Sequence, residues 1–201
     1  MPESETFEQY LSILGVEPEP PSLDHLHRLV HAQLTRVPFE NISKLYLKKT
    51  RGASFIPSLE EYLDGIERFH FGGTCYANNS YFQALLRHCG FDVSLCGADM
   101  MRPDVHVVSA VRLEGREYLV DVGYAAPFFG PLPRDLEEKH VIVFDDNRYE
   151  LHPQDTKGRS RMDQVRDGEI IPVSYTHLRA HETALRISYA VFCLKSGGGG
   201  G

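Results

Sequence analysis

The feature that most constrains the fold of this chain is a change in hydrophobic period near Gly90. Before Gly90, apolar residues recur every three or four positions, which is typical of amphipathic helices. After it, residues 105–111 and 116–122 are rich in β-branched residues and meet at Glu114-Gly115, which predicts a β-hairpin. Residues 140–144 are a further strand candidate. This order predicts an α+β fold, in which an N-terminal helical bundle is followed by an antiparallel β-barrel domain.

Capping residues place the boundaries of four predicted helices. The first ends at Gly15, and the second begins behind Ser22, a residue type favoured at the N-cap. The third begins at Ser58-Leu59-Glu60-Glu61, which has the pattern of a capping box. The fourth helix is closed by Gly90. Together these four helices form the predicted bundle.

The chain divides into three parts. Residues 1–90 form the predicted helical domain, and residues 91–171 form the predicted barrel domain. The end of the chain differs in character, because residues 172–183 resemble translated sequencing-adapter read-through and Ser196 is followed by five glycines. A glycine run has no side chains to bury. We therefore predict that residues 172–201 are a non-native, disordered tail.

Charge and composition argue against several classes of protein. The 201 residues include 21 Lys+Arg and 28 Asp+Glu, so the net charge of -7 has the wrong sign for binding a phosphate backbone. No stretch reaches the roughly 18 to 20 apolar residues of a membrane helix. The N-terminus is acidic, whereas a signal peptide is basic and then apolar. We expect a soluble, cytoplasmic protein with neither a nucleic-acid nor a membrane partner.

Cysteines and histidines show no metal-binding or disulfide pattern. Free thiols are expected, because no C-x-x-C pair occurs among Cys75, Cys89, Cys96 and Cys193. No recognisable ligand spacing joins the histidines of the helical half, which are His25, His27, His31, His70 and His88. We therefore expect no metal site.

Cys75 is the first candidate for chemistry. It follows the pair Gly72-Gly73, which permits a tight turn, and it stands at the start of the fourth predicted helix. A thiol in the first turn of a helix lies near the positive end of the helix dipole, which favours the thiolate. The alternative is that Cys75 is a small buried hydrophobic residue, as many single cysteines are.

His106 and Asp121 are predicted to meet on the hairpin. With a two-residue turn at Glu114-Gly115, Asp121 is a diagonal neighbour of His106 on one face of the sheet. A three-residue loop would place the two side chains on opposite faces. They are either a structural pair in the core or, together with Cys75, the base and the orienting group of a Cys/His/Asp triad.

Four motifs in order give the chain a specific resemblance. The first is Pro38-Phe39-Glu40-Asn41, and the second is the turn Gly72-Gly73-Thr74-Cys75. The other two are Val105-His106-Val107 and Asp121-Val122-Gly123-Tyr124. Each motif alone is weak, but in this order over about residues 5–150 the chain resembles the arylamine N-acetyltransferases.

This resemblance implies an activity and a set of site residues. It implies that Cys75 takes an acetyl group from acetyl-CoA and passes it to an arylamine, hydrazine or arylhydroxylamine, so that coenzyme A and a small amine are the expected partners. His106 would hold the thiolate and manage protons, and Asp121 would orient His106. The resemblance also implies substrate-binding positions, with oxyanion donors near Cys75 and Tyr76 and acceptor contacts at Phe39 and Tyr124. The alternative for Phe39 and Tyr124 is that they are ordinary core aromatics.

The chain also departs from that family, and these departures leave alternatives open. Phe71 stands where the family usually has an arginine, and the third, lid-forming domain is predicted to be largely missing. Another Cys/His/Asp acyl enzyme, such as an amide synthase or a transglutaminase-like hydrolase, and an inactive fragment both remain alternatives. A basic cluster fits either contact with coenzyme A phosphates or a solvated loop, and it comprises Lys44, Lys48, Lys49 and Arg51.

Overall fold

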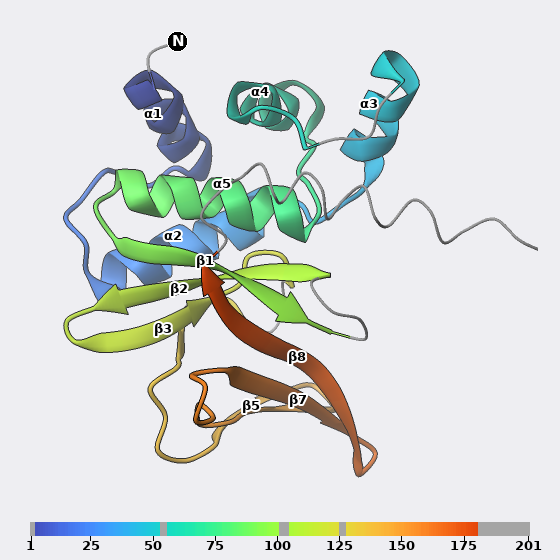
Figure 1. The fold of residues 1–201 in the computed structure, drawn as a ribbon. Coiled ribbons are helices and arrows are strands. Elements are labelled where there is room, and N and C mark those ends of the chain that lie inside the picture. Colours follow the sequence, from blue (N-terminus) through green and yellow to red (C-terminus); the bar gives the residue numbers. More distant parts are fainter. Residues whose placement is uncertain (1–2, 53–55, 101–104, 125–127, 181–201) are drawn as a thin grey trace, which may run out of the picture.

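The computed structural model describes residues 3–52, 56–100, 105–124 and 128–180, which form five helices followed by antiparallel strands. The helices are α1 (Glu3–Leu14), α2 (Leu23–Arg36), α3 (Ile42–Arg51), α4 (Leu59–Phe69) and α5 (Cys75–His88). The strands are β1 (Asp92–Asp99), β2 (His106–Leu113), β3 (Arg116–Val120), β4 (Leu132–Pro133), β5 (His140–Phe144), β6 (Asn147–Leu151), β7 (Ser160–Arg166) and β8 (Glu169–Ala180). Helix α5 packs on β1 and β2, with α1 and α4 on its other side (Figure 1).

The predicted helix boundaries are confirmed. Gly15 ends α1 with a φ of +58°, and the Ser22 side chain caps α2 by accepting a hydrogen bond from the backbone N–H of His25. Ser58 and Glu61 form the capping box of α4. These local signals set helix ends because they satisfy backbone groups that the helix itself leaves unpaired.

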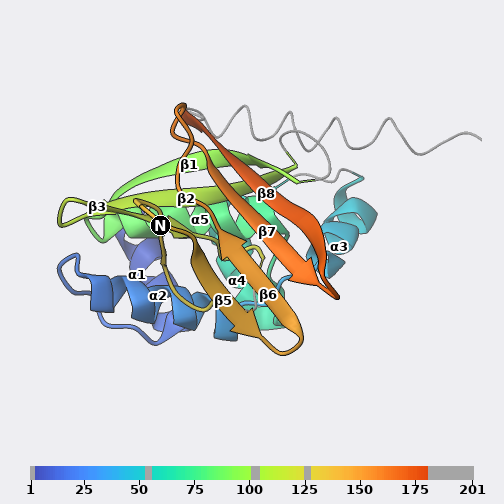
Figure 2. The same cartoon turned by 90° about the horizontal axis from the view of Figure 1, so that it is seen from below.

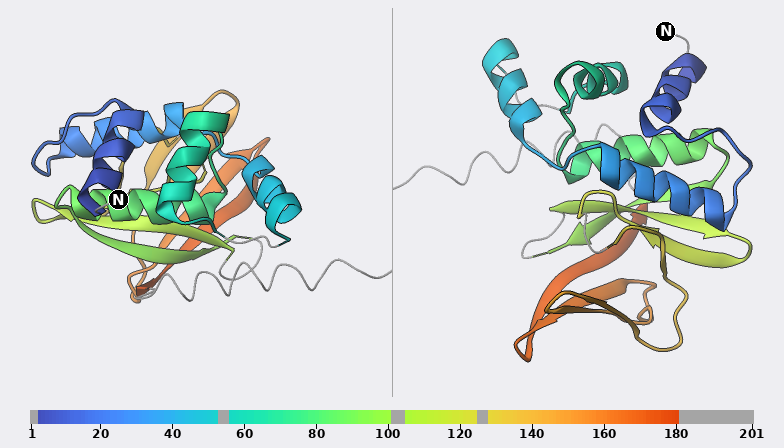
Figure 3. Two further views of the ribbon diagram at one scale, coloured as in Figure 1. Left: turned by 90° about the horizontal axis from the view of Figure 1, so that it is seen from above. Right: turned by 180° about the vertical axis from the view of Figure 1, so that it is seen from behind.

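Helix α3 was not predicted. Its basic residues are exposed or partly exposed, as expected of a solvated segment, but they lie on a helix and not in a loop. Ile42 and Leu45 have helical spacing, but they are 61% and 59% exposed. Only Leu47 of this helix is buried. The apolar pattern of α3 therefore does not face the main core, and α3 stands at the side of the bundle beside α4 (Figure 3).

The hairpin between β2 and β3 has the predicted register. Ser109 pairs with Val120 and Leu113 pairs with Arg116, so only Glu114 and Gly115 form the turn. Both turn residues have positive φ, at 52° and 77°, as a type I′ turn requires. This register puts the start of β2 opposite the segment that follows β3.

The predicted antiparallel pairing is confirmed, but the strands do not close into the predicted barrel. The strands form one antiparallel sheet in the order β4-β3-β2-β1-β8-β7-β6-β5, and among the described residues no pairing joins the two edge strands β4 and β5. Strand β4 has two residues, one of which is Pro133, and a proline cannot donate a ladder hydrogen bond. The sheet is instead bent between β1 and β8, so that its two halves face each other (Figure 2).

Two apolar cores hold this arrangement together. The first lies between the helices and the first half of the sheet, and its fully buried members include Tyr10, Leu26, Leu63, Phe82 and Val111. The second lies within the bend of the sheet and includes Cys96, Val108, Phe128, Tyr149 and Met162. The hydrophobic effect thus fixes α5 on one face of β2 and the second half of the sheet on the other.

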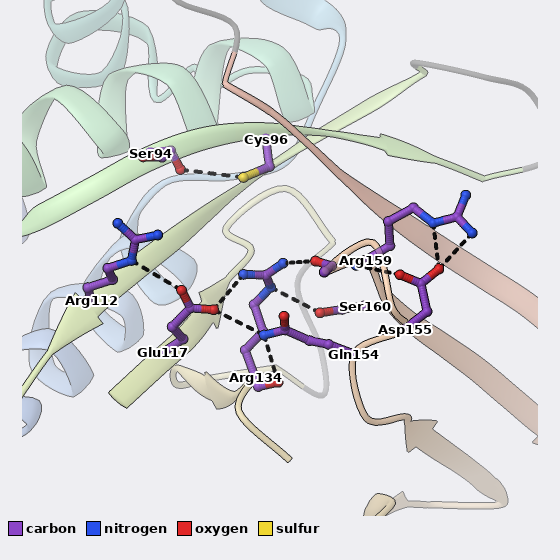
Figure 4. A network of polar contacts seen from close by, with 10 residues as sticks. Ser94, Cys96, Arg112, Glu117, Arg134, Gln154, Asp155, Arg159 and Ser160 are labelled. Atoms are coloured by element: carbon purple, nitrogen blue, oxygen red, sulfur yellow. Dashed lines mark hydrogen bonds and ion pairs between the residues drawn. The ribbon is translucent and has the colours of Figure 1, made fainter. Parts of the chain in front are cut away.

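A buried arginine links the two halves of the sheet. Arg134, which is 1% exposed, donates hydrogen bonds to Glu117 Oε2 at 2.8 Å and to Ser160 Oγ at 3.0 Å (Figure 4). It also donates to the carbonyl oxygen of Gly158. A buried guanidinium is tolerated because these acceptors replace water. The network ties β3 to the start of β7.

The predicted disorder of the tail is wrong for residues 172–180. These residues belong to β8, which pairs with β7 on one side and with β1 on the other. Residues 181–201 lie outside the described residues. Among the described residues, no helix has both the length and the apolar character needed to cross a bilayer.

Candidate active site

The turn before Cys75 is built against the segment that precedes α3. The backbone N–H of Glu40 donates to the carbonyl oxygen of Gly73 at 3.1 Å, and the N–H of Gly73 donates to the carbonyl oxygen of Pro38 at 3.3 Å. A Cβ atom at Gly72 would lie 1.9 Å from that same Pro38 oxygen. Glycine is therefore required at position 72, because any side chain would push the two segments apart.

Glu40 holds the two segments together. Its Oε1 accepts the backbone N–H of Gly72 at 2.9 Å, and its Oε2 accepts the N–H of Ser43 in the first turn of α3 at 2.9 Å. Phe71, which stands at the family's usual arginine position, instead packs its ring against Tyr46. One carboxylate thus supports both the nucleophile turn and the start of α3.

Replacing Glu40 with alanine is expected to lower the free energy of unfolding by about 1 to 3 kcal/mol, because two backbone N–H groups lose a charged acceptor. Urea unfolding followed by circular dichroism measures this change. Glu40→Gln is the matched control, since it keeps one carbonyl acceptor and should lose less. Identical unfolding of Glu40→Ala and the unaltered chain would contradict the bridging role.

Cys75 is the first residue of α5, as predicted. Its N-cap is Thr74, whose side chain makes no capping hydrogen bond. The thiol is half-buried, and its Sγ lies 3.8 Å from the carbonyl oxygen of Val105. The sulfur therefore lies at the positive end of the α5 dipole and next to the first residue of β2.

His106 and Asp121 meet on one face of the sheet, as the hairpin register predicts. His106 Nε2 and Asp121 Oδ2 are 2.6 Å apart, and both residues are buried. Burial disfavours the charged imidazole, but the Asp121 carboxylate outweighs this effect and raises the pKa of His106, with a further contribution from a hydrogen bond to Cys75. The structure thus brings the thiol, the imidazole and the carboxylate together.

Asn79 completes the arrangement, and the sequence interpretation did not assign it a role. Its Nδ2 donates to Asp121 Oδ1 at 3.0 Å, and its Oδ1 accepts the backbone N–H of Val122 at 3.0 Å. Asp121 Oδ1 also accepts the N–H of Gly123 at 2.8 Å. Burial disfavours the carboxylate, but His106 and these two donors keep the pKa of Asp121 below its ordinary value. The sequence does contain one indication of this role, because Asn79 lies one helical turn after Cys75 and therefore on the same face of α5.

The His106–Asp121 pair predicts a pH window of stability. The folded-state pKa of His106 is raised above 6.5, so its contribution is complete below that pH and is lost as pH rises through the raised value. The folded-state pKa of Asp121 is lowered below 3.8, so its contribution is complete above that pH and is lost as pH falls through the lowered value.

The pair should therefore stabilise the fold most between about pH 4 and pH 6.5. Urea unfolding of the unaltered chain and of His106→Gln, measured from about pH 3 to about pH 10, gives the contribution as a difference. That difference is expected to be largest inside the window and to shrink at higher pH. A difference that keeps growing above pH 7 would rule out the pairing described here.

The three predicted substrate-binding residues lie in different surroundings. Tyr76 is buried beside Cys75, in a small cluster with Leu95 and Val107. Phe39 is 53% exposed and forms a parallel bridge with Gly73 in the nucleophile turn. Tyr124 is partly buried against Phe128, with ring centroids 5.4 Å apart. Phe39 and Tyr76 thus lie next to the turn, whereas Tyr124 belongs to the core within the bent sheet.

The site holds the kinds of side chain that nucleophilic catalysis uses. Among the described residues, no three His, Cys, Asp or Glu side chains are grouped so as to hold a metal ion. A half-buried thiol, an imidazole with a raised pKa and a fully hydrogen-bonded carboxylate are instead the parts of a nucleophile, a base and an orienting group.

Comparisons with known proteins identify relatives of this chain. Proansamycin X synthase of Amycolatopsis mediterranei is 30% identical over 133 residues, which cover 61% of this chain and 49% of that protein. The arylamine N-acetyltransferase of Mycolicibacterium smegmatis is 31% identical over 127 residues, which cover 57% of this chain and 45% of that protein. The chain thus spans about half the length of the curated relatives that it matches.

A solved structure and a family model extend the comparison. The arylamine N-acetyltransferase of Mycobacterium abscessus superposes with a TM-score of 0.74 at 21% identity, covering 92% of this chain and 68% of that one, which shows a shared fold. The family model, described as N-acetyltransferase, matches residues 22–182 and so extends past residue 171, the predicted end of the native sequence. The chain belongs to the arylamine N-acetyltransferase family.

Proposed function

We propose that this chain transfers an acetyl group from acetyl-CoA, through a thioester on Cys75, to a small arylamine, hydrazine or arylhydroxylamine. One observation carries the proposal: His106 Nε2 lies 2.6 Å from Asp121 Oδ2, and Cys75 Sγ lies 3.8 Å from the carbonyl oxygen of Val105, the residue directly before His106. With Nε2 engaged by Asp121, Nδ1 is the ring nitrogen left to exchange a proton with sulfur.

In the first half-reaction, His106 takes the proton of the Cys75 thiol, and the sulfur attacks the carbonyl carbon of the acetyl thioester. The resulting oxyanion is stabilised by backbone N–H groups in the first turn of α5, at Cys75 and Tyr76. When the oxyanion collapses, the bond between the acetyl carbon and the coenzyme A sulfur breaks. His106 returns its proton to the departing coenzyme A thiolate.

In the second half-reaction, the acceptor nitrogen attacks the acetyl-Cys75 thioester. His106 takes a proton from this nitrogen, the bond between carbon and Cys75 sulfur breaks, and the proton passes to the Cys75 thiolate. Asp121 keeps the imidazole oriented throughout. We assign acceptor contacts to Phe39 and Tyr124, while Tyr76 contributes to substrate binding through its backbone N–H at the oxyanion. The scheme needs no metal, since the triad handles every proton transfer.

Intact mass spectrometry after incubation with acetyl-CoA tests the proposal. The unaltered chain is expected to gain the mass of one acetyl group and to lose it when an arylamine or hydrazine is added. Cys75→Ala should show no adduct. Cys89→Ala is the matched control, because Cys89 is also half-buried but lies at the end of α5 opposite to Cys75. An adduct that survives Cys75→Ala would refute the assignment of the nucleophile.

A second candidate function is amide synthesis with another acyl group. The Cys/His/Asp set would serve this reaction equally well, and one relative, Proansamycin X synthase, which is 30% identical over 133 residues, is named as a synthase and not as an N-acetyltransferase. The same experiment separates the candidates, since an amide synthase with a different acyl donor forms no acetyl adduct. An inactive fragment of the family would give rapid alkylation of Cys75 but no turnover of any amine.

A further inference from the structure

A cavity of about 210 Å³ lies between α3 and α4, outside the acyl-transfer site. Four aromatic residues line it, namely Tyr46, Tyr62, Phe69 and Phe71. The rings of Tyr46, Phe69 and Phe71 have pairwise centroid distances of 5.2 to 5.8 Å. Aromatic rings favour further aromatic partners at such distances. An apolar cavity of about 150 Å³ is already known to hold benzene, so this volume is sufficient for one ring.

Two of the aromatic side chains that line the cavity remain partly exposed, so a ligand can pack against them. Tyr46 and Phe69 are each 44% exposed although their rings lie 5.8 Å apart. Exposed apolar surface that lines a concave site marks a binding position more often than scattered surface residues do. Helices α3 and α4 lie side by side in both views of the bundle (Figures 1 and 3).

The charged side chains that line the cavity form two ion pairs, so their charges cancel. Arg51 forms an ion pair with Glu61, and Arg68 forms one with Asp64 at 3.1 Å while lying 5.1 Å from the centroid of the Phe69 ring. This balance favours a ligand without net charge. Each guanidinium carries five N–H donors, so the rim still offers hydrogen bonds to one polar substituent.

The cavity is separate from the thiol but adjoins the nucleophile turn. Gly72 contributes to its lining, and the backbone N–H of Gly72 is bonded to Glu40. Cys75 lies three positions further along and is not part of the lining. A ligand bound here would therefore contact the support of the turn and leave the sulfur accessible.

We propose that this cavity binds a small, uncharged aromatic molecule that carries one hydrogen-bonding substituent. The ring packs against Tyr46, Phe69 and Phe71, and the substituent reaches the ion pairs at the rim. Binding at this position does not depend on acyl transfer.

Titration of the full chain with para-fluorophenol, followed by fluorine NMR, tests the proposal. This probe is not an amine and so is not an acceptor for the proposed reaction. We expect saturable binding to one site with a Kd on the order of 1 mM. Alkylation of Cys75 should leave the Kd unchanged.

Gly65 supplies a blocking variant and its matched control. It lines the cavity, and a Cβ atom there would meet Phe71 at 3.6 Å, which is an ordinary contact. Gly65→Ala should therefore change the Kd less than twofold, whereas the longer side chain in Gly65→Leu should fill the cavity and weaken binding by roughly tenfold or more. Phe71→Leu, which removes one ring of the wall, should also weaken binding and serves as a second variant if Gly65→Leu does not fold.

Three results would overturn the proposal. The first is the absence of saturable binding to the unaltered chain. The second is an unchanged Kd in a folded Gly65→Leu or Phe71→Leu variant, and the third is loss of binding when Cys75 is alkylated. The last result would place the ring in the acyl-transfer site.

Discussion

Replacing Asp121 with asparagine should slow the acetylation of Cys75 by about 1,000- to 10,000-fold. Asp121 accepts a hydrogen bond from His106 Nε2 at 2.6 Å, and its charge favours the imidazolium that forms when the thiol loses its proton. An asparagine side chain has nearly the same shape but no charge, and its NH₂ group can select the wrong tautomer of the ring. The variant should thus keep the fold and lose the base. Single-turnover acetylation, quenched and read by mass spectrometry, measures the rate.

The chain offers a matched control for this variant. Asp163 is also buried, and its Oδ2 lies 2.9 Å from Nε2 of His152, in the second half of the sheet. Asp163→Asn therefore breaks the same kind of pair away from the thiol. It should lower stability but change the acetylation rate less than about twofold in the folded protein. Comparable losses of rate in both variants would show that the effect of Asp121 is structural.

The pairing of His106 with Asp121 followed from the sequence because the hairpin is local. A two-residue turn fixes the register of β2 and β3, and the register decides which side chains share a face. The position of Cys75 beside the hairpin required long-range information, because its contact with Val105 spans 30 positions. The helix start after Gly72-Gly73 is a local signal, so only the resemblance to the family brought Cys75 to the other two residues. Local backbone rules were thus sufficient to bring His106 and Asp121 together.

The supporting residues could not be predicted in the same way. Asn79 and Glu40 act through contacts with Asp121 and Gly72, which are 42 and 32 positions away in the sequence. No local pattern reveals such a contact, since it depends on how α5 and the segment before α3 pack in the folded chain. The sequence shows where Glu40 and Asn79 stand relative to the motifs, but it does not show which residues they contact.

The prediction of a barrel was wrong and helix α3 was missed, each for a different physical reason. Closing a barrel depends on the last strand pairing, and two-residue β4 with Pro133 provides too few ladder hydrogen bonds. Helix α3 was missed because it buries only one apolar residue, so its pattern is weak as a signal of core packing. Both features depend on which other elements a strand or a helix contacts in the folded chain.

Gly123 should be a position near the thiol that is highly sensitive to a small side chain. A Cβ atom there would lie 2.6 Å from Asn79 Nδ2, 2.7 Å from Cys75 Cα and 2.8 Å from Cys75 Cβ. Two of these atoms belong to the first residue of α5, which cannot move without moving the helix. Gly123→Ala should therefore lower the free energy of unfolding by about 1 to 3 kcal/mol.

The same substitution should slow acetylation of the folded protein by about 100-fold or more, because a displacement of about 1 Å between reacting groups has an effect of that size. Urea unfolding and single-turnover acetylation measure the two effects separately. Gly65→Ala is the control, since its Cβ meets only ordinary contacts at 3.6 Å or more and it removes a helical glycine. It should leave both quantities nearly unchanged or raise stability slightly. An equal acetylation rate in Gly123→Ala and Gly65→Ala would contradict this prediction. It would show that the close approach of Gly123 to Cys75 is not needed to hold the thiol, the imidazole and the carboxylate together.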